Sequence, residues 1–226
     1  MAAEVRSARL EASGLGVVYP SASGNVRALD GVDLELFRGI TAIVGPSGSG
    51  KSSLLRVLGL IDRPSAGVVR VDGREVSSLR VVERRRIRRE RIGFVFPRPA
   101  DNLIAHLSAV ENLRLSVRIR GDSGADPIGL LGSLGLAERA EHPVERLSGG
   151  EQQRVAVAAA VIGSPVVVLA DEPTAELDAG SGARLLQVVA KLAAVGTTFA
   201  VATHDPAVVA IASRVVRLRH CVVDRS

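Results

Sequence analysis

Gly-Pro-Ser-Gly-Ser-Gly-Lys-Ser, from Gly45 to Ser52, is the stretch of sequence that decides the fold. It matches G-x-x-x-x-G-K-[ST], the phosphate-binding loop. Residues 39–44 before it form a short apolar run that predicts a buried strand, and residues 52–60 after it have helical spacing. Because a strand, a glycine-rich turn and a helix N-terminus are what this motif requires, the stretch predicts a nucleotide-binding loop in an α/β fold.

Each part of the loop has a role toward a phosphate. Glycines allow successive backbone N–H groups to turn inward around an anion, and the helix N-terminus adds a partial positive charge. Lys51 can reach the β- and γ-phosphates, and the Ser52 hydroxyl is placed to ligate Mg²⁺.

The composition of the 226-residue chain allows one large domain with an aliphatic core, since 46% of the residues are apolar and there is no Trp and only one Tyr. The single cysteine, Cys221, excludes an internal disulfide. The N-terminus has no signal-peptide core, and the longest apolar stretch, 155–170, is interrupted at 163–165 and is too short to span a bilayer. We expect a protein that is soluble by itself and cytoplasmic.

The positive charge is concentrated in one segment. Between Arg80 and Arg91 the chain carries seven arginines, with only Glu83 and Glu90 as local counter-charges. Such a run is typical of a solvated helix face, and the alternative is contact with anionic lipid headgroups or an acidic partner. No nucleic acid partner is expected, because the chain has almost no aromatic side chains on which bases could stack.

The rest of the pattern predicts a sheet protein with an inserted helical region and no linker. Strands are expected at residues 8–19, 32–37, 91–96, 166–172 and 197–203. Other expected features are a loop at 20–25, a hairpin at 67–76 turning at Asp72-Gly73, helices over 97–146, a helix from 148 into the alanine-rich segment, and a helix and a strand at 206–219.

Two strand ends carry residues that suit hydrolysis. The strand at 166–172 ends in Asp171 and Glu172, and ligands bind at strand C-termini in parallel sheets. Asp171 is placed to hold Mg²⁺ opposite Ser52, and Glu172 can polarise a water toward the γ-phosphate. An Asp-Glu pair alone is more often a solvated strand end, but the phosphate loop favours catalysis. His204 follows the strand at 197–203 and is placed to contact a phosphate.

Three weaker features need context. Leu147–Glu151 opens a helix with small residues, a second anion-receptive helix start that by itself can be only a cap. Tyr19 is either an ordinary edge-strand aromatic or a ring stacked on adenine. His220 and Cys221 do not predict a metal site, because adjacent residues rarely both reach one ion.

With these motifs in this order and spacing, the chain resembles the ATP-binding-cassette (ABC) family along nearly its whole length. The matching positions are Tyr19 (A-loop), Gly45–Ser52 (Walker A), Leu147–Glu151 (signature), Val166–Glu172 (Walker B), Ala175–Asp178 (D-loop) and His204 (switch histidine). Residues 92–96 and 102–113 look most like the subfamily of lipoprotein-release, macrolide-export and cell-division ATPases.

The resemblance implies a P-loop NTPase core with an antiparallel β subdomain and an inserted α-helical subdomain. One ABC nucleotide-binding domain would occupy residues 1–226, with its core at about 1–96 and 155–226 and its helical subdomain at about 97–154. The cofactors would be ATP and Mg²⁺, the latter held by Ser52 and Asp171. The residues expected at the nucleotide are Tyr19, Gly45, Pro46, Ser47, Gly48, Ser49, Gly50, Lys51, Ser52 and Ser53.

The resemblance also implies a head-to-tail dimer with a second ATP-binding subunit, identical or different. Glu172 and His204 would be catalytic, and Asp178 would belong to the D-loop. The residues expected to bind the ATP of the partner subunit are Leu147, Ser148, Gly149, Gly150 and Glu151. The protein would then power separate transmembrane permease subunits, or a mechanotransmission complex, from the cytoplasmic face of the membrane.

Four positions depart from the family pattern. Ala159 replaces an arginine, Ala175 takes a serine or glycine place, and His220-Cys221 stands where a turn such as Asp-Gly is expected. Pro97 stands where the Q-loop glutamine belongs, and it is the departure that touches the chemistry.

Two other functions remain open. An ATP-binding switch with little or no hydrolysis is favoured by Pro97 and disfavoured by Glu172 and His204. A DNA-maintenance ATPase with the same cassette would need a long insertion, for which the 97 residues from Lys51 to Ser148 leave no room.

Overall fold

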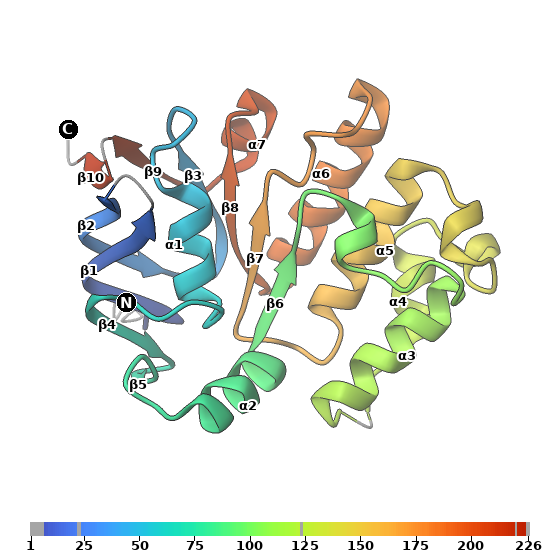
Figure 1. Cartoon of the computed structure of the whole chain (residues 1–226). Coiled ribbons are helices and arrows are strands. Elements are labelled where there is room, and N and C mark those ends of the chain that lie inside the picture. The colour runs from blue at the N-terminus through green and yellow to red at the C-terminus, as the bar shows by residue number, and fades with distance from the viewer. Residues whose placement is uncertain (1–6, 22–23, 123, 220, 225–226) are drawn as a thin grey trace, which may run out of the picture.

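The computed structural model describes residues 7–224 except 22–23, 123 and 220. A six-stranded sheet stands at the centre, a four-stranded sheet lies beside it at the N-terminal side, and a group of helices lies on the opposite side (Figure 1).

The central sheet is mostly parallel. Its spatial order is β10 (Val222–Asp224), β9 (Arg214–Arg219), β3 (Gly39–Val44), β8 (Thr198–Thr203), β7 (Val167–Asp171) and β6 (Ile92–Val95). Only the β9–β10 pair is antiparallel. All six residues of β8 are buried, as expected for a parallel strand covered on both faces.

The two faces of this sheet belong to two different cores. In β8, Phe199 and Val201 pack with the helices of one core, whereas Ala200 and Ala202 pack in the other, against α1 and the second sheet. This alternation follows from the two-residue period of a strand.

The second sheet is antiparallel, with the order β2 (Gly24–Leu36), β1 (Leu10–Ser21), β4 (Ala66–Val71) and β5 (Arg74–Glu75). The predicted hairpin at Asp72-Gly73 is confirmed, with Val71 paired to Arg74 across the turn. Both turn residues have positive φ, 45° and 76°, as a two-residue hairpin turn requires.

The loop predicted at 20–25 is wrong for the residues that the structure describes. Pro20 pairs with Asn25 and Ser21 pairs with Gly24, so β1 and β2 continue as one long hairpin. β4 pairs with β1 only as far as Gly16. Pro20 therefore has a strand neighbour on one side only, where its missing N–H is tolerated. Residues 22–23 of the same prediction lie outside the described residues.

The helices are α1 (Lys51–Leu58), α2 (Val81–Arg91), α3 (Ala109–Arg120), α4 (Pro127–Ser133), α5 (Gly149–Val161), α6 (Ala179–Ala194) and α7 (Pro206–Ile211). Short 3₁₀ turns lie at Pro99–Asp101, Ala137–Arg139 and Val144–Arg146. Figure 1 shows α3 and α4 farthest from the four-stranded sheet. Among the described residues, no helix combines the length and the apolar character needed to cross a bilayer.

Helix α2 carries the arginine run, and it is not simply a solvated face. Most of its arginines are exposed, but Arg84 is only 6% exposed. The Arg84 side chain turns inward and donates a hydrogen bond to the carbonyl oxygen of Asp62, at 2.6 Å. The expectation of a solvated run is therefore wrong for Arg84, because helical periodicity places it on the side of α2 that meets the end of α1.

Gly93 allows a close approach of β6 to α5. A Cβ at this position would overlap the carbonyl oxygen of Ala160, a backbone atom that cannot move without moving α5. We predict that Gly93→Ala lowers the free energy of unfolding by about 1–3 kcal/mol. Urea denaturation measures this change.

Gly132→Ala is the matched control, because Gly132 lies in α4 with no heavy atom within 4 Å of the added Cβ. It should be neutral or stabilising by up to ~1 kcal/mol. Equal stability of the two variants would contradict the close packing of β6 on α5.

Candidate functional site

The glycine-rich turn joins β3 to α1 at the carboxyl edge of the central sheet. Gly48 and Gly50 have φ values of 76° and 96°, which side chains other than glycine rarely tolerate. A Cβ on Gly50 would also overlap the carbonyl oxygen of Ala28 in β2. The conformation therefore explains why these positions are glycine.

A cavity of about 660 Å³ opens over this turn, a size typical of ligand sites. It is lined by Val26, Arg27, Ala28, Gly45, Pro46, Ser47, Gly48, Ser49, Gly50, Lys51, Ser52, Ser53, Glu172 and His204. Except for Tyr19, every residue predicted at the nucleotide is in this set. The structure also adds three β2 residues that the sequence did not indicate, because they depend on the pairing of β2 beside the turn.

Lys51 folds back over the turn. Its Nζ donates to the carbonyl oxygens of Gly45 and Pro46, at 2.8 and 3.2 Å. The ammonium group is therefore held beside the backbone that would surround a phosphate, where it can neutralise negative charge.

Asp171 ends β7, close to the Ser52 hydroxyl at the start of α1. Its Oδ1 atom is buried and has no hydrogen-bond partner among the described residues. Burial raises the pKa of the Asp171 carboxyl, and the hydrogen bond with Ser52 offsets part of that rise.

A hydroxyl beside an orphaned carboxylate oxygen fits Mg²⁺, which prefers oxygen ligands and retains several waters. The described residues contain no group of three or more His, Cys, Asp or Glu side chains that could hold an ion. A cation at Ser52 and Asp171 would therefore take its other ligands from phosphate and water. The sequence did not predict a metal site at His220 and Cys221, and His220 lies outside the described residues.

Glu172 and His204 form a pair at the cavity wall. His204 Nδ1 lies 3.0 Å from Glu172 Oε1, and the backbone N–H of His204 donates to Oε2 at 3.3 Å. The Glu172 backbone N–H in turn donates to the carbonyl oxygen of Ala202 in β8. Sequence reasoning assigned separate roles to these two side chains and missed their contact, which depends on β7 and β8 lying side by side.

The signature residues lie outside this cavity. Ser148 caps α5, its Oγ accepting from the Glu151 N–H at 3.4 Å while Glu151 Oε2 accepts from the Ser148 N–H at 2.8 Å. The hydrogen bonds from Ser148, first of all from its backbone, lower the pKa of the Glu151 carboxyl. Gly149 stays open, with no heavy atom within 4 Å of an added Cβ.

Asp178, predicted to belong to the D-loop, lies near the start of α5 through Ser181. Asp178 caps α6 by accepting from the Ser181 N–H at 2.9 Å. A Cβ on Gly150 would lie 2.7 Å from the Ser181 side chain. The start of α5 and the start of α6 are therefore packed together.

Tyr19 does not line the cavity over the phosphate loop. Its hydroxyl donates to Asp62 Oδ2 at 2.8 Å, and it lies near Ser53 at the start of α1. Burial, with the hydrogen bond to Asp62, raises the pKa of this phenol. Stacking on adenine stays a prediction.

Pro97 follows β6 in a turn that Asn102 holds. The Phe96 N–H donates to Asn102 Oδ1 at 2.8 Å, and Asn102 Nδ2 donates to the carbonyl oxygens of Phe96 and Arg98 at 3.2 and 2.9 Å. Gln153 Nε2 of α5 also donates to the Phe96 carbonyl, at 3.4 Å. Pro97 itself does not line the cavity. The sequence placed Asn102 at the start of the subfamily-like stretch 102–113 but did not indicate that its side chain holds this turn.

Comparison with known proteins supports one family. The sequence matches the family described as ABC transporter over residues 29–175, more than half of the chain. It is 42% identical over 221 residues to the macrolide export ATP-binding/permease protein MacB 1/2 of Paracoccus denitrificans (strain Pd 1222), covering 96% of this chain and 33% of that protein. A macrolide export ATP-binding/permease protein MacB of Rhodopseudomonas palustris (strain HaA2) is 44% identical over 219 residues, covering 95% of this chain and 33% of that protein. The chain spans about a third of the length of these curated relatives.

Solved structures share the whole fold. The ATP-binding cassette MJ0796, described as a dimer in a post-hydrolysis state bound to ADP and Pi, matches with a TM-score of 0.85 and 34% identity, covering 96% of this chain and 97% of that chain. CbiO1 of Clostridium perfringens, described as part of the ABC transporter complex cbiONQ, matches with a TM-score of 0.81 and 27% identity. The match covers 96% of this chain and 87% of that chain. These matches confirm the predicted fold class. The chain therefore belongs to the ABC transporter family and is an ABC-type ATPase.

Proposed function

We propose that this chain binds and hydrolyses ATP to power a membrane-embedded permease, by closing on a second ATP-binding subunit. The observation that carries the proposal is the cavity that Lys51 and the glycine turn line together with the Glu172–His204 pair. An anion-binding loop and a held carboxylate in one cavity suit phosphoryl transfer to water.

In this proposal the chain's own groups bind and orient the nucleotide and move one proton. Lys51 and the turn amides hold the β- and γ-phosphates, and Glu172 accepts a proton from the attacking water. His204 keeps the Glu172 carboxylate in place through the 3.0 Å contact, and as a residue of the cavity wall it would contact the γ-phosphate. Mg²⁺, held by Ser52 and Asp171, would neutralise phosphate charge.

The dimer part of the proposal is supported by the position of the signature. Ser148, Gly149 and Gly150 lie outside the cavity of their own chain, and Ser148 and Gly149 are exposed, so this helix start can complete the site of another subunit. The similar cassette MJ0796 is described as dimeric. The second subunit is identical or different.

The permease part is supported by the relatives, whose names join ATP-binding and permease functions. We place the chain on the cytoplasmic face of the membrane and expect no nucleic acid partner. An ATP-binding switch with little hydrolysis is the second candidate, since Pro97 has no side-chain group for Mg²⁺ or water.

We predict that Lys51→Ala weakens Mg·ATP binding about ten- to a hundredfold, because a charge-assisted contact to phosphate is worth about 1.5–3 kcal/mol. Lys191→Ala is the control, since Lys191 is the only other lysine and lies on α6, outside the cavity. Isothermal titration with both variants measures the affinities. Undiminished affinity in Lys51→Ala would contradict nucleotide binding at this turn.

We predict that Glu172→Gln keeps ATP binding, slows hydrolysis about a hundredfold or more and accumulates an ATP-bound dimer, because the proton acceptor is lost while Asp171 remains. Size-exclusion chromatography with Mg·ATP and a phosphate-release assay report the two effects. The control is Glu35→Gln, an exposed acid of β2 that does not line the cavity. A monomer that hydrolyses at the parent rate would show that Glu172 is not the base.

We predict that Pro97→Gln raises ATP turnover about ten- to a hundredfold, corresponding to about 1–3 kcal/mol of barrier, because a side-chain carbonyl would order Mg²⁺ and the attacking water. Pro99→Gln makes the same change two residues on, in the 3₁₀ turn, and should leave turnover unchanged. Steady-state ATPase rates of the parent and both variants are compared. Equal rates in all three would make position 97 neutral.

A further inference from the structure

A second pocket, of about 540 Å³, lies between β1, the end of α1 and α2. We call it the arginine pocket, because Arg63, Arg84, Arg85 and Arg88 line it. One acid, Asp62, lines it as well. It shares no lining residue with the cavity over the phosphate loop, and Tyr19, for which stacking on adenine is predicted, is among the residues that line it.

The one acid of the pocket is already engaged. Asp62 accepts two hydrogen bonds from Arg56, at 2.8 and 3.0 Å, and a third from the Tyr19 hydroxyl at 2.8 Å. Arg56 does not line the pocket, and its hydrogen bond is the main cause of the lowered pKa of Asp62. The carboxylate is therefore paired with a fifth arginine, and the four arginines of the pocket keep their charge.

Arg84 is the most constrained of the four. It is 6% exposed, its Nη2 atom donates to the Asp62 carbonyl, and its Nε atom is buried without a partner among the described residues. Burial lowers the pKa of this guanidinium, and the charges of Arg63 and Arg88 lower it further. A buried cation beside other cations is costly unless an anion compensates it.

Two of the neighbours are positioned by backbone. Arg63 donates to the Leu79 carbonyl at 3.0 Å, and Arg88 donates to the Leu60 carbonyl at 3.4 Å. Within the described part of the chain, none of the four arginines forms an ion pair with a carboxylate. Backbone carbonyls therefore hold the guanidinium groups of Arg63, Arg84 and Arg88, and the one acid near them, Asp62, is shared with Arg56.

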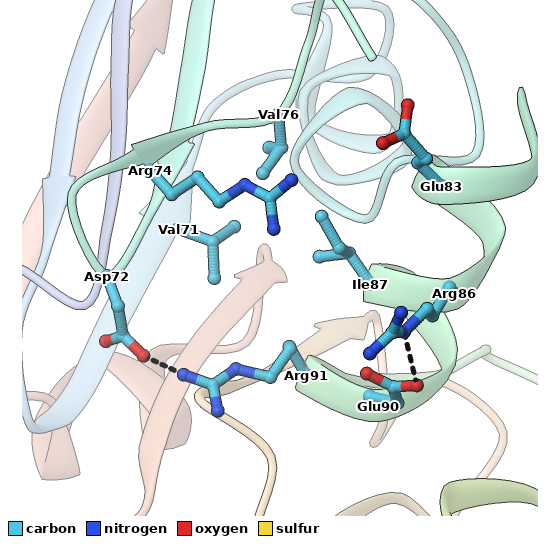
Figure 2. A pocket seen from close by; sticks show the side chains of 9 residues that line it. All are labelled: Val71, Asp72, Arg74, Val76, Glu83, Arg86, Ile87, Glu90 and Arg91. Carbon is cyan, nitrogen blue, oxygen red and sulfur yellow. Dashed lines mark hydrogen bonds and ion pairs between the residues drawn. The ribbon is translucent and has the colours of Figure 1, made fainter. Parts of the chain in front are cut away.

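A neighbouring pocket on α2 also contains several arginines, but there acidic residues balance their charge. Figure 2 shows this smaller pocket, of about 380 Å³, with an apolar floor and charged walls. Its walls carry Arg74, Arg86 and Arg91 together with Asp72, Glu83 and Glu90. Arg86 pairs with Glu90 at 3.1 Å, and Arg91 pairs with Asp72 (Figure 2). Three arginines thus meet three acids there.

We propose that the arginine pocket binds a phosphate group, either free phosphate or the headgroup of an anionic phospholipid. Guanidinium groups match phosphate oxygens in geometry and charge, and several together bind it more tightly than one. Val18 and Val81 line the same pocket and are 36% and 50% exposed, so an apolar rim adjoins the cations. This rim suits the glycerol and acyl part of a lipid.

The test uses two double variants that remove the same charge. Arg63→Gln/Arg88→Gln removes two arginines of the pocket and leaves buried Arg84 in place. Arg74→Gln/Arg86→Gln removes two arginines of the balanced pocket. All proteins are saturated with the magnesium complex of a non-hydrolysable ATP analogue, so that the phosphate loop and the position of the γ-phosphate are both occupied and do not bind the probes.

Two probes separate the two sources of phosphate. One is inorganic phosphate, followed by NMR chemical shifts. The other is sedimentation with vesicles of equal parts phosphatidylcholine and phosphatidylglycerol, compared with phosphatidylcholine alone. We expect Arg63→Gln/Arg88→Gln to bind at least one probe at least about tenfold more weakly than the parent. Arg74→Gln/Arg86→Gln should match the affinity of the parent within about twofold. If the double variant of the arginine pocket loses binding to the anionic vesicles, the ligand is a lipid headgroup. If it loses binding only to inorganic phosphate, the ligand is the free ion.

Three results would overturn the proposal. The first is that neither probe binds the parent protein. The second is that both double variants lose binding equally, which would indicate a diffuse electrostatic attraction. The third is that poly-glutamate, and neither phosphate nor the vesicles, binds the parent and loses binding in Arg63→Gln/Arg88→Gln. This result would indicate a partner that carries carboxylates. Urea midpoints check folding, and if the double variant is unstable, exposed Arg85→Gln is compared with Arg86→Gln. The test needs neither ATP hydrolysis nor a permease, so its outcome is independent of the proposed function.

Discussion

The contact of the glycine turn with β2 is the constraint on which the rest of the site depends. Gly50 adopts a φ of 96° and lies so close to the Ala28 carbonyl that no side chain fits. The turn therefore packs directly on the backbone of the four-stranded sheet. The same contact makes β2 a wall of the cavity, through Val26, Arg27 and Ala28. The antiparallel sheet is thus part of the nucleotide site as well as its neighbour.

The central sheet supplies the opposite wall by strand order alone. β7 and β8 are parallel neighbours in which Asp171 pairs with Ala202, so their carboxyl ends meet at one edge. This register sets Glu172 beside His204, and β3, on the other side of β8, delivers Lys51. Residues far apart in the chain converge because parallel strands all end at the same edge.

The sequence could predict those parts of the site that local patterns encode. The glycine turn, the acids at the end of β7 and the hairpin at Asp72-Gly73 each have a short signature with a physical cause. Cross-strand and tertiary contacts have none, which is why the Ala28 wall, the Glu172–His204 contact and the Asn102 turn were missed. The loop expected at 20–25 failed for the same reason, since only pairing reveals that β1 and β2 continue. Charge pattern likewise did not reveal that Arg84 is buried.

The Pro97 turn separates two roles that a glutamine at this position would combine. One role is to place a side-chain oxygen at the metal and water, and proline removes it. The other is to connect the end of β6 to the helices, and here the backbone is sufficient. The Phe96 carbonyl accepts from both Asn102 and Gln153 of α5, the helix that the signature begins. Because these bonds do not involve the side chain at position 97, the nucleotide edge of the sheet stays joined to the signature helix. We infer that the substitution affects the chemistry of hydrolysis more than the mechanical link between the two.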